Sequence, residues 1–235
     1  MEAHVEISES CKLQLRHALL VYADEHGAFA TLHDVLPQAA GAPLLAPAQP
    51  LSLTFLQRLA EGLGSRVAPE LLPVNILART PEMLAWWVRG SCRIMFFGEA
   101  DKEARKLNGH VFPQPPLVFK VCRGDLFVRA LERDARPEAN ARLKTAPYWN
   151  VAGDSGRVCL GTVHAPDSTS VDSMTAWQRC FFETEFTHPL GAARLTSHPG
   201  GFLGLWDSLR RKKKFPVRYL ADARQPLQEF IAQER

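Results

Sequence analysis

Pairs of strand-like runs joined by short glycine-containing turns constrain the fold of this chain more than any other feature. The pairs occupy residues 12–36, 83–97 and 117–131, and their turns fall at 24–27, 89–91 and 123–125. Strands joined this closely pair antiparallel, because a parallel pair needs a crossover of about a dozen residues or more. The sequence therefore predicts an antiparallel meander and not alternating β-α-β units.

Helical patterns lie between and after these hairpins. Residues 51–63 repeat apolar side chains at three- and four-residue spacings behind Ser52, which can cap the helix. A second pattern begins at Ser170 or Asp172, and a third covers 201–213. Strands and helices together predict an α+β fold with an antiparallel sheet.

The remaining segments define the expected domain boundaries. Residues 37–50 are rich in Pro, Ala and Gly and predict a linker or covering loop, and the polar stretch 132–146 is expected to be exposed. We predict an N-terminal β-hairpin extension with its linker over 1–48 and a core over 49–215. A C-terminal tail over 216–235 is expected to contain a short strand and a terminal helix.

Trp86 and Trp87 are adjacent in the second strand pair. Neighbouring residues of a strand face opposite sides of the sheet, so these two side chains cannot share one core. We expect one to lie in the core and the other to be covered by the N-terminal extension or a partner.

Composition excludes several classes of protein. Of the 235 residues, 46% are hydrophobic and 23% charged, which excludes bulk disorder. No apolar run reaches the roughly 18 residues of a membrane span, and the N-terminus lacks the pattern of a signal peptide. We therefore expect a cytoplasmic protein without membrane association. The net charge of +3 is too small to indicate a nucleic acid partner, and we interpret the basic run Arg210–Lys214 as a solvated helix end.

The five cysteines argue against a metal or redox centre. They form no C-x-x-C pair, and the chain has no G-x-G-x-x-G nucleotide loop. No cofactor or metal is therefore expected. Cys11, Cys92, Cys122 and Cys180 lie within apolar strands or a helix, and we interpret them as packing residues.

The motif Gly153-Asp154-Ser155-Gly156 resembles the nucleophile motif of chymotrypsin-like serine proteases. Ser155 would attack a carbonyl while backbone amides of the turn form the oxyanion hole. The match ends at Arg157, where that family has a further glycine. We favour a β-turn, because all four residue types are common in turns.

Residues 147–161 resemble the active-site segment of ubiquitin-conjugating enzymes. That family has a His-Pro-Asn tripeptide, a short glycine-containing turn, and then a Gly-x-(Ile/Val)-Cys-Leu run. Here the tripeptide position reads Tyr148-Trp149-Asn150, and the run is Gly-Arg-Val-Cys-Leu around Cys159. The resemblance implies that Cys159 is the thioester cysteine. It also implies that Asn150 helps to stabilise the oxyanion and to hold the loop.

Over about residues 50–215 the chain resembles the family of PRTRC system protein B, a bacterial family with a ubiquitin-conjugating-enzyme-like fold. Residues 113–119 and the Thr187-His188-Pro189 stretch give further support. The resemblance implies a transferase that accepts a ubiquitin-like protein as a thioester on Cys159 and passes it to an amine. It implies three partners encoded together on mobile elements: the ubiquitin-like protein, a ThiF-like activating enzyme that consumes the ATP, and a JAB-type metalloprotease.

Several polar side chains could assist such chemistry. Arg157 could favour the thiolate electrostatically, His164 could accept a proton, and His188 could approach the site. Asp167 or Asp172 could supply the carboxylate near an acceptor lysine.

Two alternatives to catalysis stay open. The replacement of His-Pro by Tyr148-Trp149 favours a non-catalytic adaptor that binds the ubiquitin-like partner without transfer. Taken without the resemblance, Cys159 between Val158 and Leu160 favours a buried thiol in a short strand.

Overall fold

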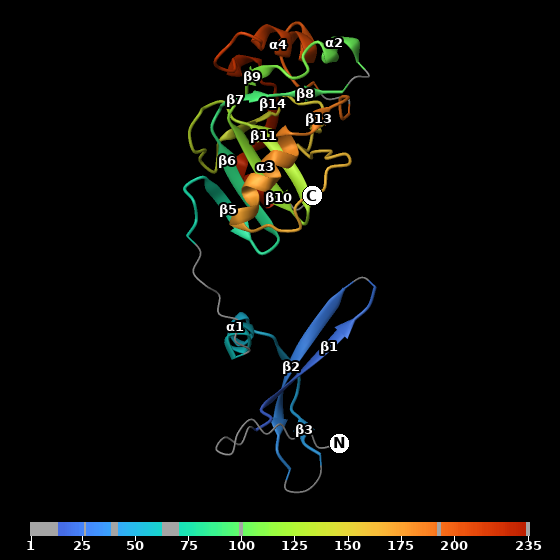
Figure 1. The fold of residues 1–235 in the computed structure, drawn as a ribbon. Helices are drawn as coiled ribbons and strands as arrows, with labels where there is room; N and C mark the ends of the chain where they lie inside the picture. Colours follow the sequence, from blue (N-terminus) through green and yellow to red (C-terminus); the bar gives the residue numbers. More distant parts are fainter. Residues whose placement is uncertain are drawn as a thin grey trace. The chain divides into compact units, whose positions relative to one another are not determined.

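A computed structural model describes residues 14–25, 27–38, 42–62, 71–98, 101–191 and 194–233. Contacts divide the chain into two units, Met1–Glu70 and Leu71–Arg235, and each is described by itself (Figure 1). The boundary predicted at 48 and 49 lies inside the first unit, because strand β4 and helix α1 group with the hairpin.

The first unit is built on the predicted N-terminal hairpin. Strand β1 (His17–Ala23) pairs antiparallel with β2 (Ala28–Leu36), which confirms the hairpin. Asp24 Oδ1 closes the turn by accepting the Gly27 N–H at 2.9 Å. The segment predicted as a linker adds two short strands to β2, namely β3 (Leu44–Leu45) and β4 (Gln49–Pro50).

Helix α1 (Leu53–Gly62) confirms the first predicted helix. Ser52 Oγ accepts the Phe55 N–H at 3.1 Å, as expected of an N-terminal cap. No side chain of α1 is buried, and among the unit's described residues only Leu32 and His33 are. The unit thus leaves many large apolar side chains exposed, including Leu15, Val21, Phe29, Leu44 and Leu53.

The second unit contains a six-stranded antiparallel sheet in the order β14-β12-β11-β10-β6-β5. Its strands are β5 (Ile76–Thr80), β6 (Met83–Val88), β10 (Leu117–Cys122), β11 (Asp125–Ala130), β12 (Arg142–Thr145) and β14 (Asp222–Pro226). The hairpin predicted over 117–131 is confirmed as β10 and β11. The antiparallel sheet with a few helices confirms the predicted α+β class.

The hairpin predicted over 83–97 is wrong. Strand β6 pairs with β5 along one edge and with β10 along the other, so neither edge is free. The chain after the turn therefore pairs elsewhere. Strand β7 (Cys92–Ile94) pairs with β9 (Val111–Pro113), and β8 (Phe96–Phe97) pairs in parallel with β13 (Glu185–Phe186).

Both faces of the sheet are covered. One face packs against α3 (Met174–Phe182), which lies across the sheet (Figure 1). Helix α4 (Gly201–Leu209) belongs to the same buried cluster but lies beside β9 at one end of the unit. The other face packs against α5 (Leu227–Ala232). Trp86 belongs to the first cluster and Trp87 to the second, which confirms that they face opposite sides. The C-terminal helix belongs to the cluster around Trp87, so the expectation that the N-terminal extension or a partner covers this indole is wrong.

Two segments predicted to be peripheral belong to the core. Strand β12 lies within the polar stretch 132–146, yet Leu143 is fully buried. Strand β14 pairs with β12, and Leu227 and Phe230 of α5 are buried in the second cluster. Within the expected tail, β14 is therefore the last strand of the sheet, and α5 covers the second face of the sheet.

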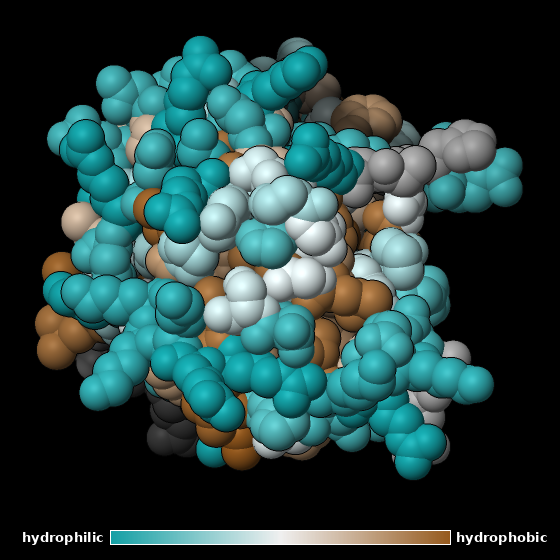
Figure 2. Space-filling model, turned by 90° about the horizontal axis from the view of Figure 1, so that it is seen from above, coloured by the Kyte–Doolittle hydropathy of each residue, from teal (hydrophilic) through white to brown (hydrophobic). Residues whose placement is uncertain are grey.

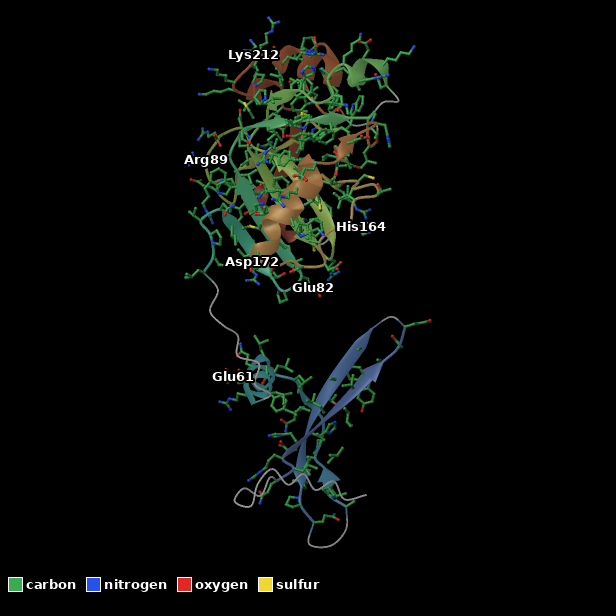
Figure 3. All side chains as sticks on the ribbon, in the orientation of Figure 1. Glu61, Glu82, Arg89, His164, Asp172 and Lys212 are labelled. Atoms are coloured by element: carbon green, nitrogen blue, oxygen red, sulfur yellow. The ribbon has the colours of Figure 1, made fainter. Side chains whose placement is uncertain are left out.

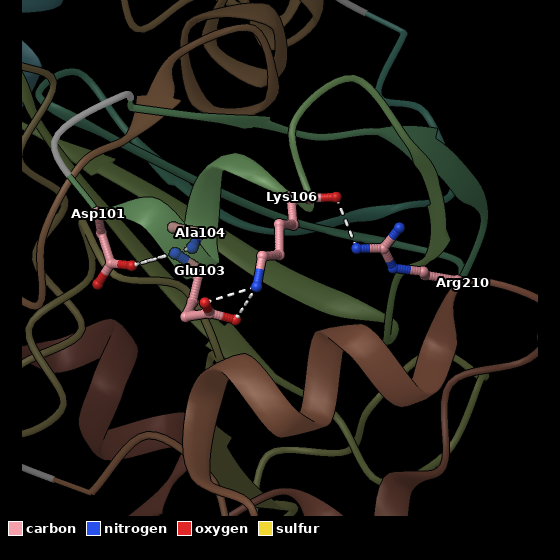
Figure 4. Close-up of polar contacts among 5 residues, drawn as sticks. All are labelled: Asp101, Glu103, Ala104, Lys106 and Arg210. Atoms are coloured by element: carbon pink, nitrogen blue, oxygen red, sulfur yellow. Dashed lines mark hydrogen bonds and ion pairs between the residues drawn. The ribbon is translucent and has the colours of Figure 1, made fainter.

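The α2 and α4 end of the second unit is polar. Asp101 Oδ1 caps the short helix α2 (Lys102–Arg105) by accepting the Glu103 N–H at 2.8 Å, and Arg210 donates to the Lys106 carbonyl oxygen at 2.6 Å (Figure 4). Hydrophilic side chains dominate this end in Figure 2. Among the described residues, no helix combines the length and the apolar character needed to span a bilayer.

Lys120, on β10, is a buried cation that fastens α5 to the sheet. Its side chain is almost fully shielded, and Nζ donates to the carbonyl oxygens of Phe230 at 2.8 Å and Gln233 at 2.7 Å. The same Nζ lies 4.5 Å from the ring centroid of Phe127 and 4.7 Å from that of Phe230. The ammonium thus binds the carbonyl end of the helix, where the helix dipole favours a cation.

Lys120→Met keeps the aliphatic stem but removes both hydrogen bonds. We expect the free energy of unfolding at pH 7 to fall by about 1–3 kcal/mol, because the carbonyl groups of α5 lose a charged donor. Urea denaturation followed by tryptophan fluorescence measures this change.

The pH dependence provides a control. Burial lowers the pKa of Lys120 below its ordinary value of 10.5, so the folded state binds this proton less tightly than the unfolded chain. The wild-type free energy of unfolding should therefore rise, relative to that of Lys120→Met, as the pH increases from neutral towards 10.5. If the free energy of unfolding changed equally with pH in the two proteins, the assignment of Lys120 as a buried cation with a lowered pKa would be contradicted.

Candidate functional site

The candidate site is a loop, residues 147–161, that docks on the edge of strand β11. The Val128 N–H donates to the Gly156 carbonyl at 2.8 Å, and the Val158 N–H donates to the Leu126 carbonyl at 2.8 Å. Strand β12 pairs with β11 only at Arg129 and Ala130, the C-terminal end of β11. The loop therefore fills the part of the β11 edge that β12 leaves open.

Aromatic side chains anchor the base of the loop in the core. Tyr148 is fully buried and its hydroxyl donates to Gln114 Oε1 at 2.7 Å, while Trp149 stacks on Phe202 with 4.7 Å between ring centroids. Burial raises the pKa of Tyr148, so its hydroxyl stays a neutral donor. The residues that replace the expected His-Pro pair are thus structural anchors of the loop.

Asn150 and Cys159 lie next to each other on this loop. The Cys159 N–H donates to the Asn150 carbonyl oxygen at 2.8 Å, and Asn150 Nδ2 lies 3.4 Å from the Cys159 carbonyl oxygen. Asn150 is 7% exposed, and its Oδ1 is buried without a hydrogen-bond donor in the part of the chain described. In this conformation the amide group binds the cysteine backbone.

The thiol of Cys159 is exposed, whereas its neighbour Val158 is buried. It borders an open surface cavity of about 400 Å³, whose lining includes Asp125, Arg157 and Leu190. The alternative of a buried thiol in a strand is therefore wrong. The backbone at Cys159 is fixed by pairing while the side chain faces solvent, which is the arrangement a nucleophile requires.

Arg157 is committed to a partner beside the thiol. Its Nη2 lies 2.8 Å from Oδ1 of Asp125, the first residue of β11. The carboxylate offsets the positive charge that we expected to favour the thiolate. Arg157 and Asp125 together form a polar wall of the cavity.

The other side chains predicted to assist the chemistry differ in how closely they approach the cavity beside Cys159. His164 is exposed, and its carbonyl accepts the Cys180 thiol at 3.6 Å. Asp167 and Asp172 are exposed and form no ion pair among the described residues. His188 precedes Leu190, whose N–H donates to the Trp149 carbonyl at 2.7 Å and whose side chain borders the cavity. The His188 stretch therefore runs beside the site.

Ser155 lies in a turn, as predicted. Its N–H donates to Asp154 Oδ1 at 2.6 Å, and its Oγ accepts the Arg157 N–H at 3.3 Å. No histidine is bonded to Ser155 in the described ranges. The arrangement lacks the base that a serine nucleophile needs.

Arg129 is the residue that sequence reasoning missed. It is fully buried on β11, and Nη1 donates to the Gly153 carbonyl oxygen at 2.8 Å, beneath the turn of the loop. Its signal in the sequence was a charged side chain two residues from Phe127 and two from Leu131, both buried on the same face.

The remaining cysteines follow the packing prediction in part. Cys122 is buried and Cys180 is half-buried, but Cys92 is exposed and its prediction is wrong, because it lies on a short strand outside the main sheet. Cys11 lies outside the described residues. No group of three or more His, Cys, Asp or Glu side chains in the described part could hold a metal ion.

The basic run lies at one end of the second unit. Figure 3 places Lys212 at the opposite end of the second unit from His164 and Asp172. Arg210 pairs with Asp207 at 2.9 Å, and residues 211–214 are exposed. This agrees with a solvated helix end.

Comparison with known proteins identifies a family. Residues 54–223, which include the whole loop, match the family model described as prokaryotic E2 family D. Neither the curated proteins nor the solved structures gave a match.

Exposure predicts the behaviour of the thiols. Iodoacetamide should modify Cys159 in the folded protein and Cys122 only after unfolding, as mass spectrometry of digested protein would show.

Cys159→Ala should change the free energy of unfolding by less than about 1 kcal/mol, with Cys92→Ala as the exposed control. A loss of about 2 kcal/mol or more would indicate a packed thiol.

Gly156 should tolerate no side chain. Its φ is +77°, and an added Cβ would lie 2.9 Å from the Val128 carbonyl oxygen and 3.0 Å from Arg129 Nε. Gly156→Ala should lower the free energy of unfolding by about 3 kcal/mol or more. Gly161, with φ of +58° but open space around it, is the matched control and should lose only about 1–2 kcal/mol as Gly161→Ala. Equal losses would show that the Gly156 contacts relax freely.

Proposed function

The chain belongs to prokaryotic E2 family D, and from this premise we propose that it accepts a ubiquitin-like protein as a thioester on Cys159 and passes it to an amine. Membership of an E2-like family implies, in general terms, a ubiquitin-like protein and its activating enzyme as partners. The observation that carries the proposal is the exposed Cys159 thiol on a backbone held in register with Asn150.

The chemistry proceeds in two transfers. The Cys159 thiolate attacks the thioester carbonyl of the charged activating enzyme, a tetrahedral oxyanion forms, and the activating enzyme's thiolate leaves. An acceptor amine then attacks the new thioester, Cys159 leaves as the thiolate, and the amine proton passes to a base or to water. No cofactor takes part on this chain, because the activating enzyme uses the ATP.

Asn150 has two proposed roles. Its amide holds the loop by contacting the Cys159 carbonyl oxygen, as its 3.4 Å separation supports. To donate to the oxyanion, the same amide must turn from this carbonyl towards the thioester. An oxyanion donor is worth about 3 kcal/mol or more in comparable reactions.

The cellular setting is proposed from the resemblance. We place the protein in the cytoplasm of a bacterium, in a PRTRC-type system on a mobile element. Its partners there would be a ubiquitin-like protein, a ThiF-like activating enzyme and a JAB-type metalloprotease. We propose no nucleic acid partner.

A non-catalytic adaptor is the second candidate. Tyr148 and Trp149 serve as core anchors in place of His-Pro, and the Asn150 amide is engaged with backbone. Both features would suit a protein that keeps the fold and binds the ubiquitin-like partner without chemistry.

A charging assay separates the two. The chain is mixed with ATP and with the ubiquitin-like protein and the ThiF-like enzyme proposed to be encoded beside it. Gels are then run with and without reductant. We expect an adduct that reductant removes, that Cys159→Ala abolishes and that the exposed-thiol control Cys92→Ala retains. Tight binding of the ubiquitin-like protein with no adduct would establish the adaptor.

A further inference from the structure

We propose that Arg129 is a positioning residue of the Cys159 site, holding the loop from beneath so that Asn150 stays opposite Cys159. The role in transfer rests on the proposed function, whereas the effect on loop geometry does not. Arg129 is neither at the surface nor in contact with the thiol, and it acts through the turn at 153–156.

The guanidinium is buried and bound to backbone. Arg129 has no exposed surface; Nη1 donates to the Gly153 carbonyl oxygen at 2.8 Å, and Nη2 donates to the Asp154 carbonyl oxygen and, at 3.4 Å, to Gln225 Oε1. Its two terminal nitrogens thus hold successive carbonyl groups of the turn. The Gln225 contact links the same guanidinium to strand β14.

No carboxylate forms a direct ion pair with this buried charge among the described residues, although the Asp154 carboxylate attracts it from a greater distance. The Asp154 carboxylate accepts the Ser155 N–H, and Arg129 Nε has no hydrogen-bond partner in that part of the chain. Burial lowers the pKa of Arg129 to about 10, so the group is still charged at neutral pH. Burying a cation whose hydrogen-bond partners are all carbonyl oxygens costs desolvation energy. An apolar side chain would fill the same space without that cost, so the arginine calls for a specific role.

The turn transmits this constraint to the cysteine. Gly156 packs against the guanidinium so closely that a Cβ would lie 3.0 Å from Nε. From there backbone hydrogen bonds run along the hairpin: Gly156 N–H to Ala152 at 2.7 Å, Ala152 N–H to Arg157 at 2.8 Å, and Cys159 N–H to Asn150 at 2.8 Å. Displacement of the turn would shift the register that sets Asn150 opposite Cys159.

Lys120 offers a matched control within the same sheet. It is also a buried cation that donates to two backbone carbonyl groups, and it lies on β10 beside β11. Its carbonyl partners belong to Phe230 and Gln233, so it fastens α5 and not the loop. A residue that merely stabilises the fold should behave like Lys120.

The experiment compares Arg129→Met, Arg129→Lys and Lys120→Met in the full chain. Three properties are measured beside the free energy of unfolding: amide hydrogen exchange at Gly156 and Cys159, the iodoacetamide rate of Cys159, and the rate of charging at saturating partner. For Arg129→Met we expect exchange at these amides to quicken and charging to slow, each by about tenfold or more, and the alkylation rate to change severalfold. Lys120→Met should keep wild-type values for all three.

Arg129→Lys keeps the charge but can reach fewer carbonyl groups, so we expect intermediate values, and it replaces Arg129→Met if that variant does not fold. The proposal is overturned if the Arg129 variants leave the loop amides and the thiol unchanged, or if Lys120→Met shifts them equally. If the wild-type protein is never charged, the proposed transfer fails, but exchange and alkylation still decide the role of Arg129.

Discussion

The need to cover both faces of one sheet organises the second unit. Trp86 and Trp87 are neighbours on β6, so each face receives a large indole that must leave water. Helix α3 covers the face that carries Trp86. The C-terminal helix α5 covers the other face, where the buried ammonium of Lys120 holds its carbonyl end. A chain ending before β14 would therefore lack both an edge strand and a cover.

The site follows from what this sheet leaves open. Strand β12 pairs with only part of β11, and the loop that carries Cys159 occupies the rest. Tyr148 and Trp149 fix one end of the loop in the aromatic core, while Arg129 holds the turn from below. Rigid support beneath and an exposed thiol above are what a site on a loop requires.

Local signals in the sequence predicted the elements but not all of their partners. The hairpin at 117–131 was predictable because its turn joins strands that do pair, whereas the turn near 90 gave no sign that both edges of β6 were taken. The motif pointed to Asn150 and Cys159, which are joined by a backbone hydrogen bond, and their roles stay predictions. Arg129 was missed because the burial of a charged side chain depends on carbonyl groups that only the folded loop supplies. The polar segment around Leu143 hid a strand for the same reason, since its burial is tertiary.

Because Cys159 is exposed, the side chain needed for the proposed chemistry is not part of the packing that maintains the fold. The backbone on either side is fixed by pairing and by buried neighbours, while the sulfur itself contributes almost nothing to that framework. A single substitution at this position would remove the thiol and leave the surrounding backbone in place. The side chain on which the proposed transfer depends can therefore change without loss of the fold.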